Sequence, residues 1–278
     1  MTYTLKLKPK PPKVWIGIPT GPGKEYAFLY MLAAVGDIDY NPKYIKITFA
    51  LTDLGDEESK QFIKRARNLV ENANYMFETE IIVTKPTEHQ KQQWQAYANI
   101  MRNMLALRRK FLKEGYDYMW VLGGDNPPPR NTLKRLLALD ADIASALIYQ
   151  RPLKDYLGVG SWPMVFQHRW ELKHLEHNGL NPEQKRILRK AWQEVGFHKI
   201  VTENPNWKRL KVLRGAVFGD GCCLIKRRVL EKIIYRIITR AYLSQDLQFC
   251  QDALVAGFTT AVDMKLHCPH LCVDGKAY

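Results

Sequence analysis

Short apolar runs that alternate with longer helical patterns constrain this chain more than any other feature. Strands separated by helices form right-handed βαβ units, which build a mainly parallel sheet flanked by helices. We therefore expect an α/β fold. The apolar runs lie at residues 14–19, 44–51, 80–84, 118–122 and 142–149, and the helical patterns between them lie at 24–35, 56–72, 88–114 and 131–139.

The alternation breaks after Arg151. The stretch that follows is rich in Trp, His, Lys and Arg and carries one clear helical pattern, at 182–195. Regular patterns resume at 215–226, followed by helices at 228–239 and 245–256 and a last strand at 259–264. We expect a basic, proline-rich arm, a first α/β half, an insertion, and a second half that completes the same domain. Their ranges are 1–13, 14–150, 151–212 and 213–278.

The charge of the chain favours anionic partners. There are 42 Lys and Arg against 28 Asp and Glu, a formal charge of +14. Nucleotide phosphates, nucleic acid and an anionic membrane surface all fit such a balance, and so does a generally basic surface with no specific partner.

The cysteines and the hydropathy pattern indicate where in the cell the protein is expected. An odd count of five cysteines in 278 residues is not a disulfide framework and favours a reducing cytosol. No apolar run approaches the roughly 20 residues that span a bilayer, and the N-terminus lacks the apolar core of a signal peptide. We expect a soluble, cytoplasmic protein, with peripheral contact to a membrane left open.

The clearest local motif is YDYMWVLGGDNPPP, at 116–129. Two glycines end an apolar strand and let the backbone approach a bulky ligand closely, and Asp125 follows them. Open α/β sheets bind ligands beyond the carboxyl ends of their strands, where a carboxylate can hold Mg²⁺ or Mn²⁺ on a diphosphate. Thr20 and Asp53 end two other strands at the same edge. The alternative is an Asx turn in which Asp125 only accepts bonds from backbone amides.

Asp246 is a second candidate, at the start of the helix in LSQDLQFCQDALVAGF. As a general base it would have to reach an acceptor hydroxyl within hydrogen-bond distance. An acid that follows Ser244 at a helix start is equally typical of a cap.

The segment HCPHLC, at 267–272, holds four potential metal ligands. A structural zinc site usually needs a second ligand pair across a longer loop, and this pair is missing. A single ligand, His270, that shares one cation with Asp125 is the more economical reading.

Two further features are weaker. Arg102 and Asn103 lie on the long helix before Asp125 and could face a nucleotide, although neighbouring basic residues also fit a solvated helix face. The turn Gly21–Lys24 resembles a phosphate loop only loosely, because it lacks the GxxxxGK[ST] spacing. The chain has no GxGxxG after a strand and no GxSxG elbow.

Four segments, in their order, resemble the A-type glycosyltransferases, especially family 2. VWIGIPTGP resembles the opening nucleotide-binding strand, and ANIMRNMLALRRKFLKEGYDYMWVLGGDNPPP resembles the stretch in which Arg-Asn precedes an Asp-any-Asp motif. GAVFGDGCCLIKRRVLEKI resembles the acceptor-side segment. LSQDLQFCQDALVAGFTTAVDMKLHCPHLC resembles the catalytic helix and the strand before a metal-ligating His. The resemblance covers residues 14–150 and 213–272.

The resemblance implies an inverting, hexosyltransferase-like enzyme with a nucleotide-diphosphate sugar as donor. The donor would be bound by Thr20, Asp53, Arg102, Asn103, Gly124 and Asp125. Asp125 and His270 would hold Mg²⁺ or Mn²⁺, and Asp246 would be the base. Two positions depart from the family pattern: the first Asp of Asp-any-Asp is Gly123, and the Glu before the base is Gln245.

The acceptor is not indicated by the sequence; a glycan, a protein or a lipid phosphate would fit. The insertion, with Trp162, Trp170, Trp192 and Trp207, is the natural place for its recognition, although tryptophans also serve core packing. Three alternatives stay open: a nucleotidyltransferase on a related sheet, a relative that has lost activity, and a non-catalytic nucleic-acid binder. The last lacks any recognised nucleic-acid-binding motif, so a nucleic-acid partner is not expected.

Overall fold

The computed structural model describes residues 10–86, 92–150, 162–163, 165–167, 209–236 and 245–273. No helix within these ranges has both the length and the apolar character needed to cross a membrane. All five cysteines fall within these ranges, and each is a buried free thiol. The absence of a disulfide framework, expected from their odd number, is thereby confirmed.

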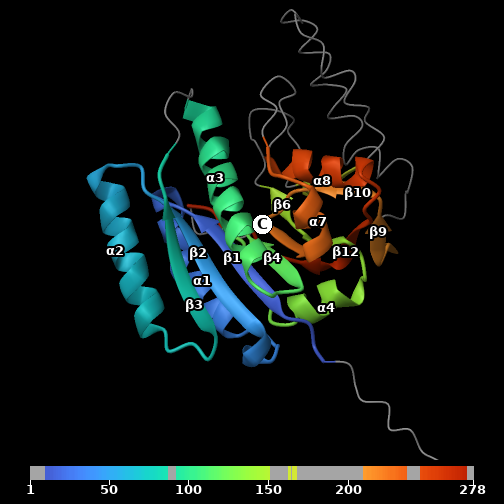
Figure 1. Ribbon diagram of the computed structural model, residues 1–278, viewed down its shortest axis with the longest axis horizontal. Helices are drawn as coiled ribbons and strands as arrows, with labels where there is room; N and C mark the ends of the chain where they lie inside the picture. Colours follow the sequence, from blue (N-terminus) through green and yellow to red (C-terminus); the bar gives the residue numbers. More distant parts are fainter. Residues whose placement is uncertain are drawn as a thin grey trace, which may run out of the picture.

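The centre of the molecule is an eight-stranded sheet (Figure 1). β1 pairs in parallel with β2 and β4, β2 with β3, and β5 with β12. In sheet order the strands are β3 (Glu78–Thr84), β2 (Ile45–Thr52), β1 (Val14–Thr20), β4 (Tyr118–Leu122), β11 (Cys222–Lys226), β5 (Ile143–Leu147), β12 (Thr260–His267) and β9 (Val212–Arg214).

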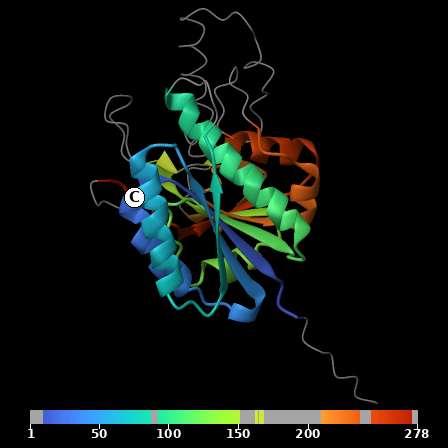
Figure 2. The same cartoon turned by 60° about the vertical axis from the view of Figure 1, so that its left-hand side comes forward.

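Helices cover both faces of this sheet (Figure 2). Side chains of α1, α2 and α4 pack on one face, and side chains of α3, α7 and α8 pack on the other. The predicted α/β fold with a mainly parallel sheet flanked by helices is confirmed. The helices are α1 (Glu25–Gly36), α2 (Glu57–Asn72), α3 (Gln92–Lys113), α4 (Thr132–Ala138), α7 (Arg227–Lys232) and α8 (Gln245–Val255), with 3-10 turns η1 (Pro22–Lys24) and η2 (Pro42–Tyr44).

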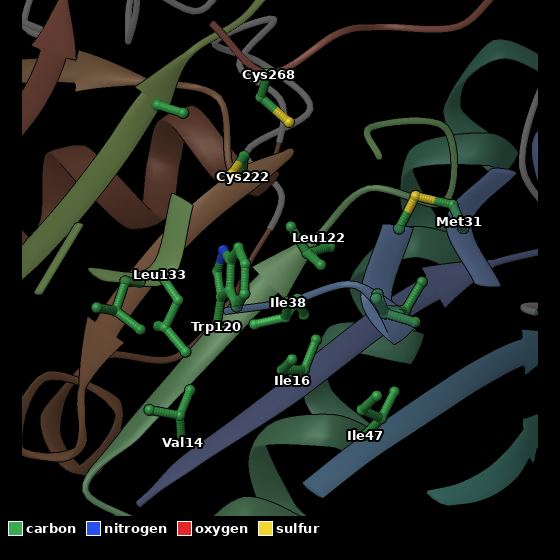
Figure 3. Packing of buried hydrophobic residues seen from close by; sticks show 14 of the residues in the cluster. Val14, Ile16, Met31, Ile38, Ile47, Trp120, Leu122, Leu133, Cys222 and Cys268 are labelled. Atoms are coloured by element: carbon green, nitrogen blue, oxygen red, sulfur yellow. The ribbon is translucent and has the colours of Figure 1, made fainter. Parts of the chain in front are cut away.

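Successive residues of β1 point to opposite faces, as a strand requires. Ile16 packs into the core under α1 and α2, whereas Trp15 packs into the core under α3. Figure 3 shows the first core, where Trp120 of β4 lies near Ile38, which follows α1, and Leu133 of α4. A central strand buried on both faces reads as a continuous apolar run, which is why these strands could be located from the sequence.

β11 runs antiparallel between β4 and β5 and was not predicted as such. Its register aligns Leu224 with Trp120 on one side and with Ala144 on the other. The strand brings the turn at Asp220 and Gly221 to the end of β4. An element from the second half of the chain therefore lies beside the motif that follows β4.

One predicted helix is shorter than expected. The pattern at 228–239 predicted three turns, but α7 ends at Lys232 and Ile233 is extended. The buried ring of Tyr235 stacks on Phe249 of α8, with centroids 4.2 Å apart. Packing of this ring against α8 takes precedence over helical periodicity.

The predicted insertion is described only in part. Its short strand β8 (Val165–Gln167) pairs with β10 (Ala216–Phe218), and β7 (Trp162–Pro163) pairs with β6 (Tyr149–Gln150). The helix expected at 182–195 and three of the four tryptophans lie outside the described residues. The division into four regions stays a prediction.

Candidate functional site

Asp125 lies in the loop that follows β4, at the carboxyl end of the parallel strands. Its side chain is buried, and three other side chains contact one of its carboxylate oxygens, Oδ2. Nε2 of His270 lies 3.0 Å from it, and the hydroxyl of Tyr26 donates to it at 3.3 Å. The ammonium of Lys24 forms an ion pair with the same oxygen. Asp125 and His270, 145 residues apart in sequence, are therefore brought together.

Electrostatics keep this carboxyl ionised. Burial alone would raise the pKa of Asp125, but the hydrogen bond with His270 and the charge of Lys24 outweigh burial and lower it. Burial and the negative Asp125 raise the pKa of Tyr26, so the phenol keeps its proton and donates it. Tyr26 also contacts the carbonyl of Leu271 at 3.2 Å.

The loop from Gly123 to Asn126 is tied to two distant segments. The amide of Gly123 donates to the carbonyl of Gly221 at 2.8 Å. The amide of Leu271 donates to the carbonyl of Asp125 at 2.9 Å, and the side chain of Asn126 donates to the carbonyl of Pro269 at 3.2 Å. The loop is thus fixed on one side by the turn before β11 and on the other by the chain after β12.

The glycines of the motif are required by close packing. A Cβ on Gly124 would lie 2.5 Å from Oγ1 of Thr20 and 2.7 Å from its Cβ. A Cβ on Gly123 or Gly221 would collide with Oδ1 of Asn126. A side chain at Gly123 or Gly221 would require the side chain of Asn126 to move.

Asn103 joins the ends of three parallel strands. Its amide donates to Oγ1 of Thr52 at 3.0 Å and to the carbonyl of Thr20 at 3.4 Å, and its oxygen accepts a bond from the hydroxyl of Thr84. The side chain is 1% exposed. The hydrogen bonds of Asn103 therefore hold the ends of these strands together. A contact between Asn103 and the donor stays a prediction.

The other predicted donor-binding residues contact the protein itself. Arg102 donates to the carbonyls of Lys85 and Pro86, each at 2.7 Å. Asp53 accepts from the amide of Gly55 at 2.9 Å and from the hydroxyl of Ser59 at 3.1 Å, which fixes the turn before α2. Their roles toward a nucleoside stay predictions.

Thr20 differs from them, because its side chain offers an unused group. Its Oγ1 is buried at the end of β1 and has no hydrogen-bond partner among the described residues. A buried hydroxyl without a partner is costly, so this atom is suited to form a hydrogen bond with a ligand.

A second acid, Asp220, lies beside the predicted base Asp246. Burial first, and then the nearby charge of Asp246, raise the pKa of Asp220. Two neighbouring carboxyls in a low-dielectric site are not both ionised readily. Its Oδ2 has no hydrogen-bond partner among the described residues. Oδ1 of Asp246 accepts from the amide of Leu247 at 2.8 Å, so the helix start fixes this side chain.

Sequence reasoning did not identify Asp220, Lys24 or Tyr26 as site residues. The only signal for Asp220 was a charged residue between two glycines directly before an apolar strand. Lys24 closes the turn that resembles a phosphate loop, and nothing in its local pattern indicated a contact with Asp125.

The side chains around Asp125 offer few ligands to a divalent cation. Mg²⁺ and Mn²⁺ prefer several oxygen ligands, and an ammonium cannot be one of them. Within the described ranges, no group of three or more His, Cys, Asp or Glu side chains could hold a metal. Asp125 and His270 therefore offer two ligands at most, on an oxygen already paired with Lys24. The four His and Cys side chains of 267–272 form no such group in the structure.

Comparison with solved structures shows a distant likeness of overall arrangement. A structure of S. aureus TarS covers 90% of this chain with a TM-score of 0.46 and 11% identity, and 35% of that chain is covered. S. aureus TarS 1-349 covers 92% of this chain, with 59% of that chain covered. The TM-score is 0.49 with 10% identity for its complex with UDP, and 0.48 with 11% identity for TarS 1-349.

The chain thus spans between one third and three fifths of the TarS chains that it resembles. No known family model matches the chain, and no curated protein sequence matches it. At identities this low, the likeness gives no role to any single residue.

Proposed function

We propose that this protein is a glycosyltransferase, which moves a sugar from a nucleotide-diphosphate sugar to an acceptor hydroxyl with inversion at the anomeric carbon. The proposal is based on one observation: the loop after β4 connects a cation with a nearby acid. Asp125 of this loop holds the cation Lys24, and Gly123 bonds to Gly221, the neighbour of the acid Asp220. Glycosyl transfer requires both, because one product leaves as an anion and the acceptor must lose a proton.

The two groups divide the reaction between them. The bond between the anomeric carbon and the diphosphate oxygen breaks, and the nucleoside diphosphate leaves with the electron pair. The acceptor oxygen forms the new bond to the anomeric carbon, and its proton passes to the carboxylate of Asp246. Charge stabilisation on the leaving diphosphate is expected to be the largest contribution to the rate.

Asp220 has a supporting part in this scheme. Because the pKa of Asp220 is raised, the scheme leaves the negative charge on Asp246, where the proton is to be received. Thr20, with its unpartnered hydroxyl, is suited to bind a polar group of the donor. The predicted Mg²⁺ or Mn²⁺ stays a prediction, and no step of this scheme passes through it.

The experiment is a transfer and binding assay on the wild-type chain and on Asp246→Asn. Sugar nucleotides are first screened by thermal shift, since a bound ligand stabilises the folded state by mass action. With the best donor, Asp246→Asn should lower kcat by about 10²–10⁴-fold, the usual contribution of a general base, and leave donor affinity nearly unchanged. The matched control is Asp252→Asn on the same helix, whose carboxylate pairs with Arg236; it should keep normal transfer.

Other outcomes would contradict the proposal. Release of pyrophosphate from a nucleoside triphosphate would indicate a nucleotidyltransferase. Salt-sensitive binding to nucleic acid, with no response to any sugar nucleotide, would indicate a binding protein. Equal loss of donor binding and transfer in Asp246→Asn would show that Asp246 is not the base.

A further inference from the structure

The turn Gly21–Lys24 carries the only lysine or arginine among the described residues that is paired with Asp125. It follows β1 directly, as the 3-10 turn η1, and the amide of Lys24 closes it by donating to the carbonyl of Gly21 at 2.9 Å. This places Lys24 at the carboxyl edge of the sheet, where ligands of such folds bind. A Cβ built on Gly23 meets no atom within 4 Å, so space lies next to the lysine.

We propose that Lys24 is the built-in cation of this site: its ammonium, positioned by Asp125, binds the diphosphate of the donor and stabilises the leaving group in place of a divalent metal ion. The proposal rests on the function proposed above and names the group that binds the donor's phosphates.

The first argument is the local charge balance. A divalent cation on a diphosphate is usually bound by one or two carboxylates, and this site offers one, Asp125, whose Oδ2 is already paired with Lys24. One buried carboxylate matches one ammonium. A second acid at position 123 would require the side chain of Asn126 to move.

The second argument is geometry. Oδ2 of Asp125 already accepts from Tyr26 and contacts His270, and it pairs with Lys24. These contacts hold the carboxylate in one orientation and direct the ammonium. The carboxylate side chain is 6% exposed, whereas the side chain of Lys24 is 41% exposed. Asp125 is thus a buried anchor, and Lys24 faces the solvent from which a donor would come.

The third argument is hydrogen-bonding capacity. An ammonium has three N–H donors, and Asp125 uses one of them. The remaining donors can bind oxygens of a diphosphate without breaking the ion pair. A hydrogen bond between charged partners contributes about twice as much as one between neutral partners. As the glycosidic bond breaks, charge grows on the leaving oxygen, and a fixed cation stabilises it without reorganisation.

The experiment measures binding of a panel of nucleoside diphosphates (UDP, GDP, CDP, dTDP and ADP) by calorimetry, in excess EDTA and again with Mn²⁺. Wild-type protein should bind its best diphosphate with the same affinity in both conditions. Lys24→Met should weaken this binding by about 10- to 100-fold, as expected for a lost charged hydrogen bond. Lys24→Arg keeps the charge and should retain most of the affinity.

The matched control is Lys134→Met, which removes an exposed ammonium that pairs with Asp39 at 2.7 Å, away from β1. Its affinity should equal that of the wild type. Circular dichroism of each variant shows whether the fold is intact. If Lys24→Met does not fold, Lys24→Gln is measured instead at a lower temperature. The same loss of affinity is expected.

Two results would overturn the inference by itself: binding that EDTA abolishes and Mn²⁺ restores in the wild type, or binding by Lys24→Met that equals the wild type. Failure of every diphosphate to bind the wild type, with and without Mn²⁺, would instead overturn the proposed function together with this inference. The two failures are therefore distinguishable.

Discussion

Replacement of Asn103 by alanine tests how the edge of the sheet below the candidate site is held. The side chain makes one well-formed bond to Thr52, one to the hydroxyl of Thr84, and a longer one, 3.4 Å, to the carbonyl of Thr20. Removal of a partner that leaves a buried polar group unsatisfied costs about 1–3 kcal/mol, and the long bond adds little. Thr52 is buried and Thr84 is half-buried, so the bond to Thr84 adds only about 1 kcal/mol, and the predicted loss in the free energy of unfolding is about 2–4 kcal/mol.

The assay is urea unfolding followed by circular dichroism, together with a thermal scan. For a chain of this size, 1 kcal/mol shifts Tm by about 2–4 °C, so Asn103→Ala should lower Tm by roughly 4–16 °C. The matched control is Asn72→Ala. The side chain of Asn72 is exposed and bonds only to a carbonyl of its own helix, at 2.7 Å from Asn68. Its effect should stay within about 0.5 kcal/mol.

A double-mutant cycle separates the hydrogen bond from simple loss of volume. Thr52→Val removes the hydroxyl that Asn103 contacts and keeps the shape of the side chain. In the double variant the two effects should be coupled by about 0.5–3 kcal/mol, because both remove the same bond. Strictly additive effects, or an Asn103→Ala protein as stable as the wild type, would refute the idea that this amide fastens the strand ends.

Two further predictions concern pH. The pKa of Asp142 is lowered, because bonds from Thr259 and Arg228 outweigh burial. Asp142→Asn should therefore cost about 1–3 kcal/mol near pH 7. This cost should shrink as the pH falls below the ordinary pKa of 3.8, as measured by urea titrations across this range. The pKa of Asp220 is raised, so the folded state binds its proton more tightly than the unfolded chain does, and stability falls as pH rises above the ordinary value of 3.8. Asp220→Asn should stabilise the protein more at about pH 8 than at about pH 4. An equal effect at the two pH values would show that the carboxyl is not protonated in the fold.

Several elements of this fold could be derived from the sequence. The strand at 118–122 has the predicted bounds, because a buried strand in a parallel sheet is a continuous apolar run ended by glycine. α2 begins one residue after Asp56, whose side chain accepts from the amide of Ser59 at 2.8 Å, and acids in its first turn had indicated that start. The same reasoning placed Asp125 at the edge where ligands bind.

The antiparallel direction of β11 could not be derived in this way. An apolar strand buried on both faces has the same pattern whichever way it runs. Its direction depends on which neighbouring edge is free when the second half of the chain folds back. The shortening of α7 has a similar origin, because the stacking of Tyr235 on Phe249 is a contact between two elements and leaves no local periodicity.

The chain by itself determined that an acid would stand at the end of β4 and a histidine after β12. Only the tertiary structure determines which side chains contact Asp125. Lys24 lies 101 residues from Asp125, and the turn carrying Asp220 reaches the same loop through a backbone bond at Gly123. Such contacts are set by how strands from distant parts of the chain align at one edge. A local pattern records burial and periodicity, and it contains no information about which distant side chain will share a given oxygen.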